Sequence, residues 1–172
     1  MQAYAHYQEG RHHMPNWCNN DIVFTGDDLP KFKEWLSQGK FSFERIKPTP
    51  QDLLEGEGWY NWRVNNWGTK WDIDPATYGE SIKDTEIGIS FDTAWSPPIE
   101  ALYELHKQFP LLNIKLNYWE MGLAFAGEAL YANGICNDTC YSQDEDAKLY
   151  NEMLRKMGYE YDEEEQDYVS IY

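Results

Sequence analysis

The sequence is poor in basic residues. Its 172 residues include 14 Lys and Arg against 30 Asp and Glu, which gives a formal net charge of −16 at pH 7. A protein with this balance repels phosphate backbones and anionic lipid surfaces. No cluster of Lys or Arg stands out that would reverse this repulsion locally. Direct nucleic-acid binding is therefore disfavoured.

Cysteine and long apolar runs are also scarce. Three cysteines are an odd and small number, so a secreted disulfide framework is disfavoured and a reducing bacterial cytoplasm is the expected location. No segment approaches the roughly 18 apolar residues that a membrane helix needs, and residues 1–13 lack the apolar core of a signal peptide. Because residues 1–13 also differ in character from the rest of the chain, we interpret them as an extension or tag.

Few residue combinations suit metal binding or catalysis. Outside the suspected extension the single histidine is His106, on the apolar stripe of a predicted helix, where a structural role is favoured over metal ligation. Cys136 and Cys140 lack the second pair that a structural zinc needs. No nucleophile motif or phosphate-binding loop is present. We expect no metal and no cofactor, and an enzyme is the less favoured class; Glu120 and Glu128 are the carboxylates to watch if it is one.

The hydrophobic pattern predicts a small α/β fold. Alternating or continuous apolar residues predict strands at 19–26, 86–92 and 112–118, followed by one that ends near residue 132. Apolar residues at helical spacing predict helices within residues 28–39, 96–109 and 143–157. Ser96 is the expected N-cap of the second helix. Residues 40–85 show no period and are expected to be a long irregular insertion rich in Trp.

This order of elements predicts an α/β (α+β) sandwich. Two strand-helix-strand crossovers followed by a hairpin give a sheet of about four strands with two helices on one face. We assign this domain to residues 14–136. Residues 137–172 are expected to form an acidic C-terminal helix and hairpin packed on the same domain.

Aromatic residues are abundant, with eight Trp and 13 Tyr. The stretch NWRVNNWGTKWDID at 61–74 combines Trp with Asn and Gly. Its large side chains either anchor the insertion to the sheet or line a surface or pocket that binds a ligand or partner. The residues of this candidate surface are Trp67, Gly68, Thr69, Lys70, Trp71, Asp72, Trp95, Ser96 and Glu120.

The acidic residues are concentrated near the C-terminus. Residues 137–172 contain 11 acidic and three basic residues, so this segment carries half of the net charge. One interpretation is a solvated surface that keeps the protein soluble. The other is an acidic face for a basic partner, such as a nucleic-acid-binding protein. The residues of this candidate face are Asp162, Glu163, Glu164, Glu165 and Asp167.

Four motifs carry a resemblance to a known family. They are MPNWCNN at 14–20, NWGTKWD at 66–72, FDTAWSPP at 91–98 and YWEMGLAFAGE at 118–128. In this order they resemble the YubB-like, ferredoxin-like domain family of bacterial plasmids and phages. The resemblance spans residues 14–134. It implies a ferredoxin-like sandwich in which the second and third motifs meet, and it implies no iron–sulfur cluster and no established activity. The acidic tail is expected to be an addition of this chain.

Three functional hypotheses remain open at this point. The first is a non-enzymatic, phage- or plasmid-encoded protein that binds a bacterial host or defence protein, with the acidic face as one means of doing so. The second is a small-molecule-binding protein or enzyme that uses a Trp-lined pocket. The third is a structural or virion-associated protein. The sequence does not decide the oligomeric state.

Overall fold

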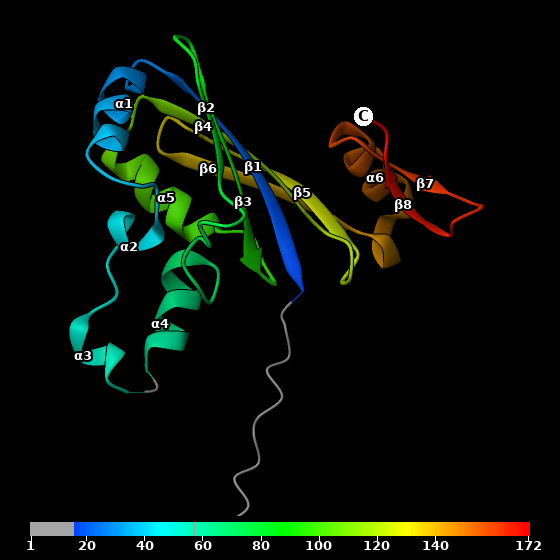
Figure 1. Cartoon of the computed structure of the whole chain (residues 1–172), viewed down its shortest axis with the longest axis horizontal. Helices are drawn as coiled ribbons and strands as arrows, with labels where there is room; N and C mark the ends of the chain where they lie inside the picture. Colours follow the sequence, from blue (N-terminus) through cyan, green and yellow to red (C-terminus); the bar gives the residue numbers. More distant parts are fainter. Residues whose placement is uncertain (1–15, 57) are drawn as a thin grey trace, which may run out of the picture.

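The fold is built on a six-stranded antiparallel sheet in the order β2-β3-β1-β4-β5-β6 (Figure 1). The structure is a computed structural model that describes residues 16–56 and 58–172, so the expectation for residues 1–13 lies outside the described residues. The strands are β1 (Trp17–Gly26), β2 (Gly79–Ile82), β3 (Ile87–Ala94), β4 (Leu112–Glu120), β5 (Phe125–Ala132) and β6 (Ile135–Ser142).

Two interleaved crossovers give the sheet a ferredoxin-like core. β1 and β2 run parallel to each other with β3 between them, and helical segments connect them. β3 and β4 run parallel with β1 between them, and α5 (Ile99–Gln108) connects them. A strand of each crossover therefore lies between the two strands of the other crossover, which gives the antiparallel order β2-β3-β1-β4.

The sheet has six strands instead of the expected four or so because β2 and β6, which the sequence does not predict, add one strand at each edge. β6 escapes sequence-based detection because most of its residues are exposed on both faces. β2 is missed for a different reason. It is only four residues long, it is almost entirely exposed, and it lies within residues 40–85.

Residues 40–85 form short regular elements where the sequence predicts an irregular insertion. These elements are α2 (Phe43–Ile46), α3 (Gln51–Leu54), α4 (Gly58–Trp67) and β2. Two of the helices are single turns, which are too short to show a helical period. In α4 apolar residues occur on more than one side of the helix, since Trp62 and Trp67 are five positions apart and point in different directions. Tyr60 and Val64 lie on the same side as the buried Trp67 and are nevertheless exposed, so burial does not follow one stripe.

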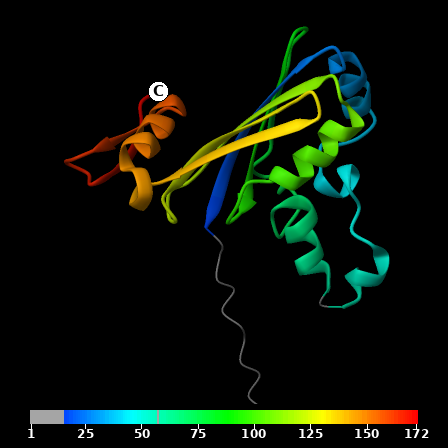
Figure 2. The same ribbon diagram turned by 180° about the vertical axis from the view of Figure 1, so that it is seen from behind.

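Helices cover the two faces of the sheet unequally. α1 (Leu29–Ser37) and α5 pack on one face, over a core that includes Phe24, Phe32 and Leu116. The opposite face is covered at one end by α6 (Gln143–Lys156) and by the hairpin of β7 (Tyr159–Asp162) and β8 (Asp167–Ser170) (Figure 2). A second apolar cluster lies beneath α6, made of Trp119, Ala126, Tyr150, Met153 and Leu154.

A glycine in β5 leaves room for a tyrosine side chain to cross that strand. Tyr118 on β4 donates its hydroxyl to a carboxylate oxygen of Asp138 on β6 at 2.7 Å. Its ring passes over Gly127, which lies between them on β5. A Cβ atom at this position would collide with the Tyr118 ring and would lie 2.6 Å from the carbonyl oxygen of Thr139.

We therefore expect Gly127→Ala to lower the free energy of unfolding by about 1–3 kcal/mol, the usual cost of overpacking a core. Denaturant unfolding followed by circular dichroism measures the change. Gly56→Ala is the matched control, because a Cβ there meets nothing within 4 Å. Equal unfolding midpoints for the two variants would show that the Tyr118 ring is not confined.

Candidate functional site

Three tryptophan side chains form a row at the end of the sheet where β1 begins and β3 ends. β1 begins at Trp17, which pairs with Ala94, the last residue of β3, so Trp95 follows directly beside it. The ring centres of Trp17 and Trp71 are 6.2 Å apart. Those of Trp71 and Trp95 are 6.4 Å apart, with the planes stacked at 27°. Trp17 is 41% exposed, and the other two are half-buried.

A lysine ammonium group lies among these rings. The Nζ atom of Lys70 is 4.4 Å from the ring centre of Trp71, 5.2 Å from that of Trp95 and 5.8 Å from that of Tyr60. These distances allow cation–π attraction. Within residues 16–56 and 58–172, Lys70 forms no ion pair with a carboxylate. We call Trp17, Tyr60, Lys70, Trp71 and Trp95 the tryptophan surface.

The backbone beneath this surface is held in an uncommon conformation. Trp95 has a φ of 66°, in the left-handed region that bulky residues rarely adopt. Its N–H donates to the carbonyl oxygen of Asn16 at 3.0 Å. Ser96 donates its hydroxyl to the carbonyl oxygen of Gly68 at 2.6 Å and does not cap α5, whose N-cap is Pro98. The motifs around Gly68 and Trp95 are thereby joined.

Two predicted members of the surface are buried. Trp67 is 0% exposed, and its indole N–H donates to the carbonyl oxygen of Lys47 at 2.9 Å. Thr69 is also buried and donates its hydroxyl to the carbonyl oxygen of Ala94 at 3.1 Å. Trp67 therefore anchors the chain to the end of α2 and Thr69 anchors it to β3, and neither side chain is exposed to a partner.

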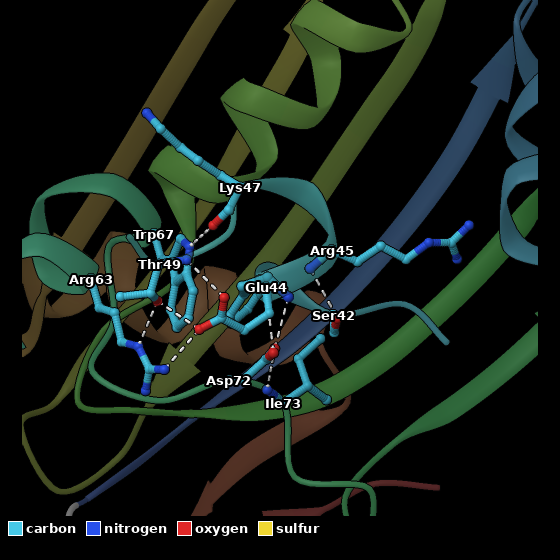
Figure 3. A network of polar contacts seen from close by, with 10 residues as sticks. Ser42, Glu44, Arg45, Lys47, Thr49, Arg63, Trp67, Asp72 and Ile73 are labelled. Carbon is cyan, nitrogen blue, oxygen red and sulfur yellow. Dashed lines mark hydrogen bonds and ion pairs between the residues drawn. The ribbon is translucent and has the colours of Figure 1, made fainter. Parts of the chain in front are cut away.

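Asp72 caps a helix. Its carboxylate accepts hydrogen bonds from the backbone N–H groups of Phe43 at 2.7 Å and Glu44 at 3.2 Å, in the first turn of α2 (Figure 3). It also accepts from its neighbour Ile73 at 2.8 Å. The N–H groups of Phe43 and Glu44 have no partner within the helix, so the carboxylate satisfies donors that would otherwise be left open.

A second polar network ties α2 to α4. Glu44 accepts from the hydroxyl of Thr49 at 2.6 Å and from the guanidinium of Arg63 at 2.8 Å, and Arg63 also donates to Thr49 (Figure 3). Partial burial of Glu44 opposes its ionisation. The hydrogen bonds from Thr49 and Arg63 outweigh this effect and lower the pKa of the Glu44 carboxyl group.

The remaining candidate acids lie elsewhere. Glu120 is 3% exposed and accepts from the N–H groups of Gly122 at 2.7 Å and Leu123 at 2.5 Å, so it closes the turn between β4 and β5. The acidic face lies in the β7–β8 hairpin, where Asp162 accepts from two backbone N–H groups of the turn. This hairpin and α4, which carries Tyr60, lie at opposite ends of the molecule (Figures 1 and 2).

The structure thus brings together Lys70, Trp71 and Trp95 of the predicted set and adds Trp17 and Tyr60. Trp17 belongs to the MPNWCNN motif, so a sequence signal existed for it. Tyr60 had none, because α4 was not predicted. A cavity of about 630 Å³ lies away from these residues, between α1, the loop before α2 and β2, and it is lined by Leu36, Phe41, Ile73, Tyr78 and Glu80 among others.

His106 has a structural role. It is buried, its Nε2 accepts from the N–H of Gly134 at 3.0 Å, and its Nδ1 lies 3.0 Å from the carbonyl oxygen of Leu112. In the part of the chain that the structure describes, no three His, Cys, Asp or Glu side chains are grouped as metal ligands would be. No described helix is both long enough and apolar enough to cross a membrane.

The fold and the site define a ferredoxin-like α+β domain with an aromatic surface. A family model described as "Ferredoxin-like domain in Api92-like protein" matches residues 67–170, and the chain belongs to this family. The match supports the ferredoxin-like part of the resemblance, and it carries neither the YubB-like name nor a phage or plasmid origin. It also includes α6 and the β7–β8 hairpin, so the acidic segment is part of the family domain and not an addition to it.

The chain is also similar to a solved structure, that of protein api92 from Yersinia pseudotuberculosis. The similarity covers 58% of this chain and 39% of that chain, with 19% sequence identity and a TM-score of 0.45. The chain therefore spans less than half the length of this relative. A search of the curated proteins finds no match.

Because Asp72 caps α2, we expect Asp72→Ala to lower the free energy of unfolding by about 0.5–2 kcal/mol, the usual cost of losing a cap. Asp72→Asn should cost less, because its amide oxygen still accepts from the N–H groups of Phe43 and Ile73 and only the bond from Glu44 to the second oxygen is lost. Thermal or denaturant unfolding of the two variants measures the difference. An equal loss for both would mean that the negative charge, not the hydrogen bonds, is what the fold requires.

The lowered pKa of Glu44 makes its contribution depend on pH. The ionised group stabilises the fold above the pKa of the unfolded state, and this stabilisation is lost as pH falls through the lower folded-state pKa. We expect Glu44→Gln to be less stable than wild type at pH 7, with the gap closing below about pH 4. Unfolding midpoints measured from pH 7 to pH 3 test this. Glu34→Gln, at an exposed site, is the control, and a gap that stays constant with pH would contradict the expectation.

Proposed function

We propose that the protein is a non-enzymatic binding protein and that the tryptophan surface is where it contacts its partner. The observation that carries this proposal is the partly exposed row of Trp17, Trp71 and Trp95 around the Lys70 ammonium group. Trp and Tyr are enriched at the centres of protein interfaces, where a few such side chains supply most of the binding energy.

The strained backbone supports the same proposal. A bulky residue in the left-handed region costs about 1–3 kcal/mol, and such residues concentrate at functional sites. At Trp95 this conformation accompanies an indole stacked on Trp71. A purely structural aromatic residue has no need to be half-exposed at such a cost.

For the partner, we propose a bacterial host or defence protein in the cytoplasm, bound by a chain of phage or plasmid origin. The motif resemblance motivates the origin. The net charge of −16 favours a partner with a basic surface, because complementary charge speeds encounter and suppresses binding to acidic proteins. In this proposal the acidic hairpin steers the partner and the tryptophan surface provides the main contact.

A small-molecule-binding protein is the second candidate. The cavity of about 630 Å³ favours it, because ligand pockets span about 300–1,000 Å³ and combine apolar walls with a few polar groups. Here the polar groups include Lys40 and the Tyr78 hydroxyl, which donates to Glu80 at 2.6 Å. This site is separate from the tryptophan surface.

The test is capture of bacterial proteins by the wild type and by matched variants, followed by affinity measurement with the purified partner. We expect Trp17→Ala combined with Trp71→Ala to weaken binding by about thirtyfold or more, the effect of losing an interface hot spot. Tyr161→Ala removes an exposed aromatic side chain on the acidic hairpin and should leave binding unchanged.

Melting temperatures establish that every variant is folded. The steering role of the hairpin is tested with Glu163→Gln, Glu164→Gln and Glu165→Gln together, which should slow association and reduce its salt dependence. A partner held equally by the wild type and by the folded double Trp variant would overturn the proposed surface.

A further inference from the structure

The outer edge of β6 is an unpaired strand edge. β6 is eight residues long, pairs with β5 residue by residue without a bulge, and is the last strand of the sheet. No described segment pairs with its other side, and in Figure 2 it runs along the outside of the sheet in yellow. A row of backbone N–H and C=O groups is therefore available along its length.

This edge lacks the features that usually protect a free edge. Edge strands are commonly short, bulged, or supplied with Lys or Pro. β2 at the opposite edge has four residues and is followed directly by Lys83. The β6 sequence ICNDTCYS contains neither Lys nor Pro. Its one carboxylate, Asp138, is bound back onto its own sheet by the Tyr118 hydroxyl. The contrast between the two edges indicates that β6 is suited to pairing with another strand.

A hollow beside the start of β6 can receive a side chain. It measures about 410 Å³ and lies between α5 and the first residues of β6. Ile99, Tyr103, Ile135 and Cys136 form its apolar walls, and Glu100 is at its side. Ile135 is 59% exposed, so its side chain is available for contact at the edge of the hollow.

The charge around the edge indicates the chemistry of the occupant. Residues 135–146 contain four carboxylates and no Lys or Arg, and Glu100 adds another beside the hollow. A second copy of this chain would bring two such acidic strands together, and each copy has a net charge of −16. Like charges across an interface are unfavourable. A strand that carries basic residues is complementary.

We propose that the β6 edge binds an extended segment of a partner protein that alternates apolar and basic residues, which becomes the seventh strand of the sheet. Backbone hydrogen bonds along the edge supply affinity. One apolar side chain enters the hollow formed by α5 and β6. The basic side chains that alternate with it lie on the opposite face, toward the carboxylates of Asp144, Glu145 and Asp146 at the start of α6. This inference goes beyond the tryptophan surface and does not depend on it.

The probe for the test is an end-blocked octapeptide of alternating Val and Lys. Two N-methylated isomers, with the methyl groups on every Val or on every Lys, have the same charge. Each lacks the N–H groups along one side of the strand, because alternate N–H groups point the same way. We expect the two isomers to differ in affinity by about tenfold or more, since several backbone hydrogen bonds are lost in only one of them.

Hydrogen exchange and two matched variants locate the binding. Amide exchange of alternate β6 residues should slow with the unmodified peptide, while that of β2 should not change. Thr139→Lys adds a positive charge on β6 and should weaken binding by about tenfold, because Lys protects edges and repels the basic strand. Ile82→Lys adds the same charge on β2 and should change the affinity by less than about twofold.

Three outcomes would overturn the proposal. Equal binding of the two isomers, or equal weakening by the two Lys variants, would mean that the peptide is held by charge alone. Absence of peptide binding to the folded protein would mean that the edge is not a peptide site. Concentration-dependent dimerisation that Thr139→Lys abolishes, seen by sedimentation without peptide, would mean that the occupant is a second copy of the chain.

Discussion

The burial of Trp67 is the contact on which the candidate site depends. Its ring packs against Phe43, with the centres 5.7 Å apart, and Phe43 in turn packs against Phe91 on β3 at the same distance. The indole N–H is satisfied by Lys47, so the ring is buried without leaving a donor unpaired. Because Trp67 ends α4, its burial fixes the starting point of the chain that carries Lys70 and Trp71.

Polar contacts then determine how that chain continues. Asp72 is bound to the first turn of α2, and Gly68 is bound to Ser96, so residues 68–72 are held at both ends. The side chains of Lys70 and Trp71, between these ties, are left on the surface. The Trp residues of the motif therefore divide into two kinds: Trp67 is buried in the core and stabilises the fold, and Trp71 remains half-exposed at the surface.

The sequence predicted the strands that bury the side chains of one face and expose those of the other. β1, β3 and β4 each bury alternate residues, so their period is visible. β2 and β6 are edge strands with mostly exposed residues and give no such signal. The meeting of Trp71 with Trp95 followed from the shared motifs. The cap formed by Asp72 could not be predicted from the sequence, because its partner Phe43 lies 29 residues away and helix α2 is a single turn.

The acidic C-terminal segment shows why charge alone does not define an appendage. Trp119 and Ala126 lie on the sheet face that α1 and α5 leave open, and Tyr150, Met153 and Leu154 of α6 cover them. The hairpin carboxylates lie on the outside of the same packed unit. A segment that closes an apolar cluster belongs to the domain whatever its surface charge, which agrees with a family match that runs to residue 170. Packing therefore places no constraint on the exposed carboxylates, while the buried side of α6 is constrained by the sheet.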